Sequence, residues 1–478
     1  MSAQLVAKTL ARIERAQPSS EKTFAIRSPI DGTVVARVSN CGTEEAHRAA
    51  DNAASAFASW KHATAYERAA LLRRWLSLTA QHEAEMALLI ALEMGKPVTE
   101  ARGEVRYGAT FIEWFAEEAK RVYGDTVPSQ FPNKRIMVQR QPTGVAYGIT
   151  PWNFPVAMVT RKVAPALAAG CTFILKPAEQ TPLSALYLAA LWEEAGGPPG
   201  TFQVLPTLDP VPVSQVLLDD VRVRVLTFTG STTVGMHLYE RCARTMKRVG
   251  LELGGHAPFL IFDDANLEAA VREAIACKFR NAGQTCICTN RIYVHEGVAD
   301  EFSERLSQAV AALRVGNPLE DATQIGPLVD AQGFAKVEAH VTDAIEKGAH
   351  VLTGGRPIEG LFFQPTVLTG VTPGMLVMQE ETFGPIAPVL TFRADAEAVR
   401  LANDTPYGLA AYLWTNDLGR AYHVAEALDY GIVGVNDGVP ATAQAPFGGM
   451  KNSGLGREGG RWGIEEYLDI KSISISLP

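Results

Sequence analysis

The chain has 478 residues, of which 47% are hydrophobic and 20% charged, and its formal net charge at pH 7 is -8. This length predicts two or three domains or one large α/β body, and the composition excludes a mostly disordered chain. The negative charge argues against a nucleic-acid partner held through its phosphates.

The cysteine content and the hydropathy pattern indicate a cellular compartment. Six cysteines are too few for a disulfide scaffold in a chain of this length, and no His/Cys cluster has zinc spacing, so we expect no metal. Residues 1–17 lack the apolar core of a signal peptide, and no apolar run reaches about 18 residues. We therefore expect a cytoplasmic protein without a membrane span.

The first quarter of the chain predicts helices and one hairpin. Residues 1–17 have the pattern of a short amphipathic helix. Residues 22–40 place turn residues between two β-rich runs, which predicts a hairpin. Residues 43–119 are rich in Ala, Leu, Glu and Arg at helical spacing and predict several long helices. Thr43, followed by two glutamates, is the expected cap of the first of them.

Strands and helices then alternate. Residues 134–141 alternate apolar and polar side chains, as in a strand with one wet face, and residues 144–150 predict a buried strand. After it come, in order, the strand TFILK, a helix at 183–195, the strand FQVLP, a helix at 212–219 and the strand VRVLTFTG. This rhythm predicts a parallel sheet with helices on both faces.

A second α/β segment is predicted from near Gly250. Its strands APFLIF, RIYVH and APVLTF accompany long helices at 266–280 and 299–313. The last six residues, ISISLP, form an apolar run typical of a β-strand. Such a run can be a simple edge strand, or it can pair with another subunit.

Cys286 is the first candidate for chemistry. It lies in FRNAGQTCIC, after a predicted helix and among small and polar residues, and Gly283 permits close backbone approach. A catalytic thiol needs a partly open site and a lowered pKa. Cys288, two positions on, could trap an oxidised Cys286 as a disulfide, or it could be inert. The other thiols are interpreted as buried structural residues: Cys41, Cys171, Cys242 and Cys277.

Three further segments contain residues that could take part in catalysis or cofactor binding. Glu252 lies between apolar residues and a Gly-Gly turn, where burial would raise its carboxyl pKa and suit it to activate water, unless it is a surface residue. In PWNFP, at a strand's carboxyl end, Asn153 could donate to an oxyanion, and Trp152 could cover a flat cofactor ring or belong to the core. FTGSTTVG, residues 228–235, could bring backbone amides to a pyrophosphate or be a plain turn.

These segments together resemble the aldehyde dehydrogenase superfamily along essentially the whole chain. The shared motifs, in one order, are PWNFP, KPAEQTP, FTGS, LELGG, GQTC, EETFGP and PFGG. Longer stretches are similar to the branch of NAD(P)-dependent succinate-semialdehyde dehydrogenases: FRNAGQTCIC, APFLIFDDA, NDTPYGLAAY, EALDYGIVG and PFGGMKNSGLGREG.

The resemblance implies a fold. It is an α/β fold with two Rossmann-like α/β domains and a β oligomerisation arm. The expected NAD-binding domain comprises residues 1–121 and 141–248, and the catalytic domain comprises residues 249–447. Residues 122–140 and 448–478 would form the arm and the C-terminal tail. A homodimer or a homotetramer is expected.

The resemblance also implies a division of labour. Cys286 would attack the aldehyde carbonyl, and the Asn153 side chain with the Cys286 N–H would hold the thiohemiacetal oxyanion. Hydride transfer to the nicotinamide would leave a thioester, which water activated by Glu252 would hydrolyse. Intact Cys286, Glu252 and Asn153 argue against an inactive structural relative. The retained Glu252 favours hydrolysis over acyl-CoA formation.

Nine residues would line or contact the cofactor. In order along the chain they are Trp152, Lys176, Glu179, Gly230, Ser231, Gly235, Leu253, Glu381 and Phe383. Glu179 would accept both adenosine ribose hydroxyls and repel a 2′-phosphate, whereas Ser, as in NADP-using relatives, would not repel it. We therefore expect NAD as the preferred cofactor, with NADP as the alternative because Lys176 offsets part of the repulsion.

Two arginines suggest the substrate class. In the succinate-semialdehyde branch, the residues that match Arg161 and Arg280 clamp the substrate carboxylate, and a guanidinium pair suits any small oxyanion. The serine of relatives five residues before the PFGG proline is Ala441 here, so a hydroxyl is missing unless Thr442 replaces it. Succinate semialdehyde is expected first, and glutarate semialdehyde, 2-oxoglutarate semialdehyde and sulfolactaldehyde are the alternatives. A broad dehydrogenase of neutral aldehydes is disfavoured by the arginines.

Overall fold

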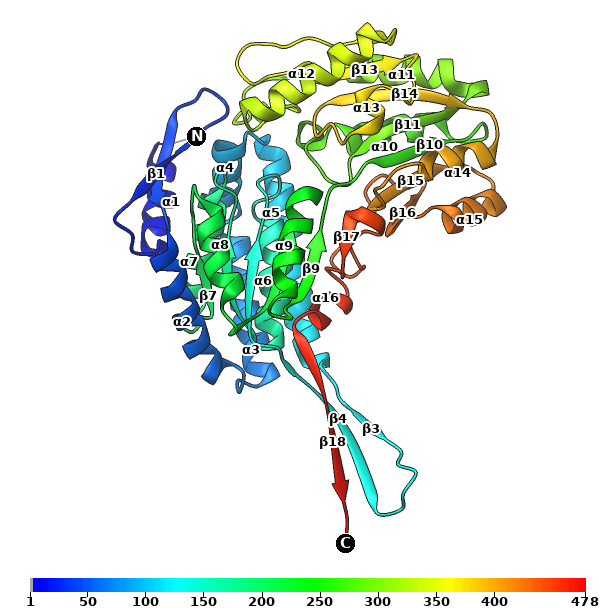
Figure 1. Cartoon of the computed structure of the whole chain (residues 1–478). Helices are drawn as coiled ribbons and strands as arrows, with labels where there is room; N and C mark the ends of the chain where they lie inside the picture. Colours follow the sequence, from blue (N-terminus) through cyan, green and yellow to red (C-terminus); the bar gives the residue numbers. More distant parts are fainter. Residues whose placement is uncertain (1–2) are drawn as a thin grey trace.

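Two β-sheets and a projecting β-ribbon organise the computed structural model, which describes residues 3–478. In Figure 1 the first sheet lies in the lower body among the N-terminal helices. The second sheet lies in the upper body, and the ribbon extends downward and ends near the C-terminus. The expected α/β fold with two sheet-centred units and an arm is confirmed by this arrangement.

The N-terminal part is helical apart from one hairpin, as the sequence predicted. Its elements are α1 (Ala3–Ala16), β1 (Thr23–Arg27), β2 (Val34–Ser39), α2 (Thr43–Trp60), α3 (Ala65–Gln81), α4 (Glu83–Met94), α5 (Val98–Glu118) and η1 (Ala119–Arg121). The cap of α2 differs from the expectation at Thr43. Gly42 is the capping residue, and its N–H donates to the Glu45 carboxylate at 2.7 Å. An acidic side chain three residues on therefore closes this helix end.

The first sheet has six strands in the order β17-β9-β8-β5-β6-β7. Its strands are β5 (Val145–Ile149), β6 (Thr172–Lys176), β7 (Phe202–Val204), β8 (Val223–Thr229), β9 (Arg248–Glu252) and β17 (Gly454–Leu455). All neighbouring strands pair in parallel except β17, which pairs antiparallel with β9. Four helices connect them: α6 (Ala157–Ala169), α7 (Pro182–Glu194), α8 (Pro210–Asp219) and α9 (Thr232–Ala243). The predicted alternation is confirmed.

The second sheet has seven strands in the order β12-β13-β14-β11-β10-β15-β16, parallel except for β12. Its strands are β10 (Ala257–Ile261), β11 (Thr289–His295), β12 (His350–Thr353), β13 (Thr366–Thr369), β14 (Ile386–Phe392), β15 (Ala410–Trp414) and β16 (Ile432–Val435). Its helices are α10 (Leu267–Lys278), η2 (Arg280–Gly283), η3 (Glu296–Val298), α11 (Ala299–Ala311), α12 (Ala331–Glu346), α13 (Leu376–Gln379), α14 (Asp395–Asn403) and α15 (Leu418–Ala427).

The chain crosses between the units later than the expected boundary at residue 249. Strand β9 belongs to the first sheet because Gly250 and Glu252 pair with Thr227 and Thr229 of β8. Much later in the chain, β17 returns to the same sheet and pairs with β9. It is preceded by η4 (Lys451–Ser453) and followed by α16 (Trp462–Glu465). The exact domain division stays a prediction, but Glu252 ends a strand of the first sheet.

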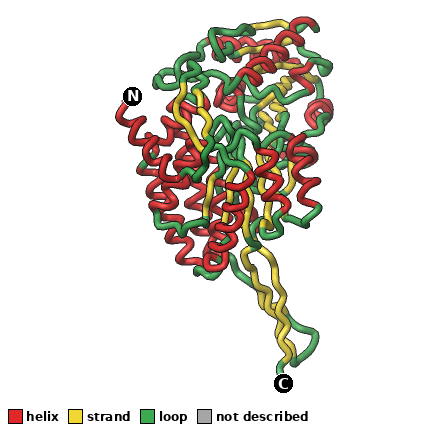
Figure 2. Tube along the Cα trace, turned by 60° about the vertical axis from the view of Figure 1, so that its left-hand side comes forward, coloured by secondary structure: helices red, strands yellow, loops and turns green. Residues whose placement is uncertain are grey.

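A three-stranded ribbon projects from the lower body (Figure 2). It consists of β3 (Asp125–Val127), β4 (Lys134–Pro142) and β18 (Leu468–Ser476). The C-terminal run therefore pairs antiparallel with β4 of its own chain, from Leu468 opposite Pro142 to Ser476 opposite Lys134. The ribbon's apolar side chains are largely uncovered, and Ile470 is 73% exposed.

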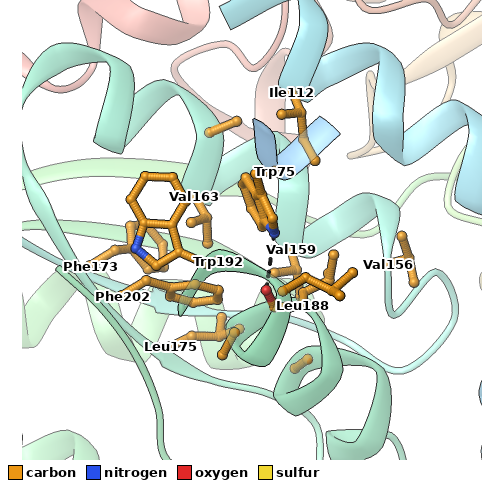
Figure 3. Packing of buried hydrophobic residues seen from close by; sticks show 14 of the residues in the cluster. Trp75, Ile112, Val156, Val159, Val163, Phe173, Leu175, Leu188, Trp192 and Phe202 are labelled. Carbon is orange, nitrogen blue, oxygen red and sulfur yellow. Dashed lines mark hydrogen bonds between the residues drawn. The ribbon is translucent and has the colours of Figure 1, made fainter. Parts of the chain in front are cut away.

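The lower body is held by an aromatic core (Figure 3). Trp75 and Trp192 are buried edge-to-face, with ring centroids 5.6 Å apart, and Phe202 packs against Trp75. The Trp75 indole N–H donates to the Leu188 carbonyl at 3.0 Å, so its polar atom is satisfied inside the core. This core fixes α3 and α7 against the sheet whose carboxyl ends face the site.

Candidate active site

A cavity of about 330 Å³ lies where helices of the lower body meet the η2 region of the upper body. Cys286 and the two arginines, Arg161 and Arg280, all line it. Half of the other lining residues are apolar, namely Phe154, Met158, Ile287, Val439, Ala441 and Phe447, and the charged ones are Lys96, Glu100 and Glu104. A thiol and two guanidinium groups therefore share one enclosed space, as the sequence predicted.

Cys286 lies between η2 and β11 and is the one cysteine of the described chain that is not fully buried. Burial raises the pKa of its thiol to about 12, and the Arg161 guanidinium acts in the opposite direction. The carboxylates of Glu381 and Glu252 add to the rise. The lowered pKa expected for a reactive thiol is thus not found, because the site is desolvated and the carboxylates offset the arginine. Cys286 needs a base to take its proton.

The loop before Cys286 has an uncommon backbone. Asn281, Ala282 and Gly283 all have positive φ, at 54°, 54° and 75°. A Cβ atom on Gly283 would lie 2.1 Å from the Gly384 carbonyl oxygen, which explains the glycine. Non-glycine residues rarely adopt this conformation, and their clustering beside Cys286 marks a loop that its surroundings hold in place.

Asn281 stabilises this loop through hydrogen bonds. Its backbone N–H donates to the Glu100 carboxylate at 2.8 Å, and its side-chain amide donates to the backbone carbonyls of Asn153 and Gln284, both at 3.1 Å. The residue thus ties the Cys286 loop to the PWNFP segment of the other unit. Sequence reasoning missed Asn281, although an asparagine in a small-residue loop is a recurring sign of left-handed backbone.

Asn153 is buried beside this loop. Its side-chain amide donates to the Gln284 carbonyl at 3.1 Å, and its Oδ1 has no partner among the described residues. The Lys96 ammonium donates to the Asn153 backbone carbonyl at 2.8 Å and thereby helps to fix the PWNFP segment. Likewise, the Cys286 backbone N–H makes no hydrogen bond within residues 3–478. Two donors of the kind an oxyanion needs are present, at Asn153 and Cys286.

Glu252 ends β9 and is buried. Burial raises the pKa of its carboxyl well above the usual range, the neighbouring Glu458 carboxylate adds to the rise, and the Arg161 guanidinium opposes it. This is the direction expected from the sequence. Its Oε2 has no partner within the described chain, and a Cβ atom on Gly448 of the PFGG motif would lie 2.8 Å from its Oε1. The motif's glycine thus leaves room for the carboxylate.

Glu458 is a site residue that sequence reasoning did not find. Its carboxylate pairs with Arg161 at 2.7 Å and, more closely, with the Lys162 ammonium. These cations hold the pKa of the buried Glu458 carboxyl below its usual range. Glu458 is separated from Arg161 by almost 300 residues, and no spacing rule connects such positions. The carboxylate neutralises part of the Arg161 charge.

The arginines keep donors free. The Arg161 guanidinium, only 2% exposed, stacks on the Phe447 ring with its centre 3.9 Å from the ring centroid. Arg280 lies over the Phe154 ring at 5.5 Å. The Nε atoms of both arginines have no hydrogen-bond partner among the described residues. Thr442 differs from the expectation: its side chain is exposed and does not line the cavity, whereas Ala441 does.

A second cavity of about 530 Å³ lies at the carboxyl ends of β5, β6 and β8. Trp152, Lys176, Glu179 and Gly230 line it, and the Lys176 ammonium lies 3.1 Å from the Glu179 carboxylate. Ser231 caps α9, since its hydroxyl accepts the Val234 N–H at 3.4 Å. A helix N-terminus at the mouth of a cleft at the carboxyl ends of parallel strands suits the phosphates of a dinucleotide.

Four other predicted cofactor residues surround this cleft without lining it. A Cβ atom on Gly235 would lie 2.3 Å from Leu253 Cδ2, so these two residues pack directly behind its wall. Glu381 accepts the Gly255 N–H at 3.2 Å, and burial raises its carboxyl pKa to about 7. Phe383, with φ of 55°, packs edge-to-face on Trp152 at 5.4 Å. That ring contact joins the two units.

Cys288 lies behind the nucleophile, fully buried and away from the cavity. Its Sγ is 3.4 Å from the buried Lys278 ammonium, which also donates to Asn290 at 3.0 Å. Burial raises the pKa of the Cys288 thiol, and Lys278 lowers it.

In residues 3–478 no cluster of three or more His, Cys, Asp or Glu could hold a metal ion. No helix in that range is long and apolar enough to cross a membrane.

This combination of fold and site defines a family. The family model described as "Aldehyde dehydrogenase family" matches residues 16–473, and the chain belongs to that family. It is therefore an oxidoreductase of the NAD(P)-dependent aldehyde dehydrogenase class. The resemblance drawn from the motifs is confirmed.

Individual relatives are similar along almost the whole chain. A glutarate-semialdehyde dehydrogenase of Pseudomonas putida is 52% identical over 456 residues, 95% of each chain. The NADP⁺ succinate-semialdehyde dehydrogenase of Escherichia coli is 53% identical, covering 95% of this chain and 94% of its own. A 3-sulfolactaldehyde dehydrogenase of Pseudomonas putida is 52% identical, with coverage of 95% and 94%. The crystal structure of succinate-semialdehyde dehydrogenase from Burkholderia pseudomallei superposes with a TM-score of 0.95 at 51% identity, covering 96% of each chain.

Proposed function

We propose that the protein oxidises a small aldehyde with an anionic tail, succinate semialdehyde first, to the carboxylic acid with NAD. One observation carries the proposal: Arg161 and Arg280 line the cavity that contains the Cys286 thiol, and each keeps an unpartnered Nε donor. Buried cationic donors without acceptors suit a carboxylate or sulfonate. The relatives at about half identity act, by their names, on aldehydes of this class.

In the first half of the reaction the chain supplies a nucleophile and an oxyanion site. The Cys286 proton leaves to water in the cavity, and Glu252 is kept for the second half of the reaction. Sγ then bonds to the aldehyde carbon, and the carbonyl electron pair moves to oxygen. Asn153 and the Cys286 N–H would donate to that oxygen in the thiohemiacetal. NAD, when bound, supplies the acceptor for the hydride that leaves the carbon.

In the second half Glu252 would act on water. A carboxylate whose pKa is raised by burial accepts a proton from water more readily than an ordinary one does. The resulting hydroxide adds to the thioester carbon, the C–S bond breaks, and Cys286 recovers its proton. Hydrolysis is favoured over transfer of the acyl group to coenzyme A because this carboxylate is retained, in a small pocket that Arg161 also lines.

The cleft at the first sheet fits a dinucleotide. It lies at the carboxyl ends of parallel strands and has a helix N-terminus at its mouth, and a larger residue at Gly235 would require Leu253 to shift. Lys176 and Glu179 would bind the adenosine ribose. The pyrophosphate would lie beside Gly230, Ser231 and Gly235. We propose that Glu381 and Phe383 bind at the nicotinamide end.

The exact aldehyde depends on one wall of the cavity. Ala441 contributes only a methyl group, and Thr442 faces outward. Glutarate semialdehyde, 2-oxoglutarate semialdehyde and sulfolactaldehyde therefore stay as alternative substrates within the same proposal. A broad activity on neutral aldehydes would leave both unpartnered arginine donors without a function.

Replacing Arg280 with leucine tests the anionic tail. Leucine keeps the bulk and removes the donors, so we expect kcat/KM for succinate semialdehyde to fall roughly 100-fold while that for butanal is retained or rises. Steady-state NADH formation with both aldehydes measures the ratio. Arg280 is the cleaner position, because Arg161→Leu also removes one of the two cations that pair with the buried Glu458.

The exposed arginine Arg272→Leu is the matched control and should change neither value. Wild-type activity of Arg280→Leu on succinate semialdehyde, with no gain on butanal, would refute the clamp. The same assay run with glutarate semialdehyde and sulfolactaldehyde ranks the alternative substrates.

Replacing Glu179 with serine tests the cofactor preference. The carboxylate that would repel a 2′-phosphate is removed and Lys176 is released from its 3.1 Å ion pair. We expect kcat/KM with NADP to rise roughly tenfold and that with NAD to fall. Initial rates with each cofactor measure this. Glu194→Ser, at an exposed glutamate of α7, is the control. A wild-type kcat/KM at least as high with NADP as with NAD would overturn the NAD preference.

The assembly and regulation are part of the same proposal. We propose a homodimer or homotetramer joined through the exposed ribbon of β3, β4 and β18, in a cytoplasmic enzyme. The exposed apolar side chains of the ribbon support this assembly. Formation of a Cys286–Cys288 disulfide stays a proposal as well, and Cys288 would have to leave its place beside Lys278 for it to form.

A further inference from the structure

One hydroxyl group in the reactive cavity has no function in the mechanism above. Tyr107 lies on α5, one turn after Gly103 and Glu104, and all three line the cavity. Among the residues that the structure describes, the Tyr107 hydroxyl has no hydrogen-bond partner. Tyr107 is partly buried, so a ligand that displaces water from the hydroxyl must offer it an acceptor in exchange.

The Tyr107 ring is held in a fixed orientation. It packs against the small apolar cluster of Phe154 and Met158. The Phe111 ring contacts it edge-to-face, with centroids 5.1 Å apart and planes at 80°. The same Phe111 ring lies 5.5 Å from the Arg161 guanidinium. The phenol is therefore fixed by packing near an arginine of the cavity, and little conformational freedom is lost when it binds a ligand.

The charges around the hydroxyl make it a donor. Burial raises its pKa, and the guanidinium groups of Arg161 and Arg280 act in the opposite direction. Both arginines are thus close enough to influence the phenol, and so is the Cys286 thiol. A phenol with a raised pKa stays protonated at neutral pH and can donate its hydrogen to an anion. The other unpartnered hydroxyl of the lining, that of Thr285, precedes Cys286 directly in the chain, and Ala441 has no hydroxyl.

We propose that Tyr107 is a specificity-determining residue, whose hydroxyl donates to the anionic end group of the substrate alongside Arg161 and Arg280. The inference rests on the proposed function, because it requires an aldehyde with a carboxylate or sulfonate tail. It adds a neutral donor from α5 to a cavity in which Ala441 offers only a methyl group. A neutral donor adds recognition without adding charge to a cavity that already contains three cations, Lys96 among them.

The test is Tyr107→Phe, which removes one oxygen atom and keeps the ring. We expect KM for succinate semialdehyde to rise about tenfold, since bonds to charged groups are stronger than neutral ones, while kcat changes less than about twofold. For butanal, a neutral aldehyde of the same chain length, both constants should stay at their wild-type values. A residue that only packs would affect the two aldehydes equally.

Competitive inhibition gives a second measurement that does not depend on turnover of the anionic substrate. With butanal as substrate, the inhibition constant of succinate should rise about tenfold in Tyr107→Phe, and that of butyramide should not change. Tyr66→Phe, at a tyrosine 75% exposed on α3, is the matched control. Unchanged KM and unchanged succinate inhibition, or an equal loss on both aldehydes, would overturn the inference.

The two levels of the proposal fail separately. If Arg280→Leu retains full activity on succinate semialdehyde, the anionic-tail proposal fails and the Tyr107 inference fails with it. If Arg280→Leu loses that activity and Tyr107→Phe does not, only the Tyr107 inference fails.

Discussion

Replacement of Cys286 with alanine is expected to lower kcat by at least ~10³-fold, because the sulfur forms the covalent intermediate and no neighbouring group can replace it. Within the described chain it is the one thiol that opens into the cavity. The remaining five are buried, and their replacement leaves the reaction intact. Steady-state NADH formation measures the loss, and titration of NAD by fluorescence shows whether the cofactor cleft is retained.

Cys41→Ala is the matched control, since that thiol is buried on the far side of the first unit and burial raises its pKa to about 12. Iodoacetamide should inactivate the wild type, with a rate that NAD and the aldehyde modulate, and should label one cysteine by mass spectrometry. Retention of more than about a tenth of the activity in Cys286→Ala would exclude the thiol as the nucleophile.

Glu252→Gln is expected to lower kcat by roughly 10³-fold while a rapid burst of NADH, up to one per active site, is retained. Glutamine cannot take a proton from water, so the thioester on Cys286 accumulates after hydride transfer. Stopped-flow absorbance at the NADH band separates the burst from the steady state. Glu346→Gln, at an exposed residue ending α12, is the control. Loss of the burst itself would place Glu252 in the step before hydride transfer.

The pH dependence follows from the same group. The pKa of the Glu252 carboxyl is raised by burial and by Glu458, and the base is the deprotonated form. The active fraction therefore increases as the pH rises through this raised pKa, and kcat should fall on the acidic side at a higher pH than for an ordinary glutamate. In Glu252→Gln the residual kcat should lose this acidic limb. An acidic limb that persists in the variant would assign the titration to another group.

Much of the fold was predictable because it follows local patterns. The apolar runs of β5, β6 and β8 are buried on both faces, and helical spacing identified α2 to α5. The boundary at residue 249 was less predictable. Strand β9 has a Gly and two charged residues, a weak strand signal, and its place in the first sheet depends on pairing with β8. Such pairing is a tertiary property.

The site was predictable where a short motif carries the chemistry. Cys286, Arg161 and Arg280 were expected together, and they line one cavity. Tyr107 and Glu458 were not found, because a tyrosine on an amphipathic helix and a glutamate near a loop have ordinary local sequences. Their positions depend on packing between segments far apart in the chain. The direction of a thiol pKa likewise depends on burial, which no motif encodes.

The order in which the chain is made bears on when this chemistry can begin. Arg161 and Lys162 are synthesised almost 300 residues before Glu458, the carboxylate that pairs with both. Strand β9 is synthesised about 200 residues before β17, so until then the first sheet has an open edge beside Glu252. A chain still attached to the ribosome therefore contains its nucleophile and its base, but not the contacts that arrange them. The reactive centre is completed among the last events of folding, after both units have formed.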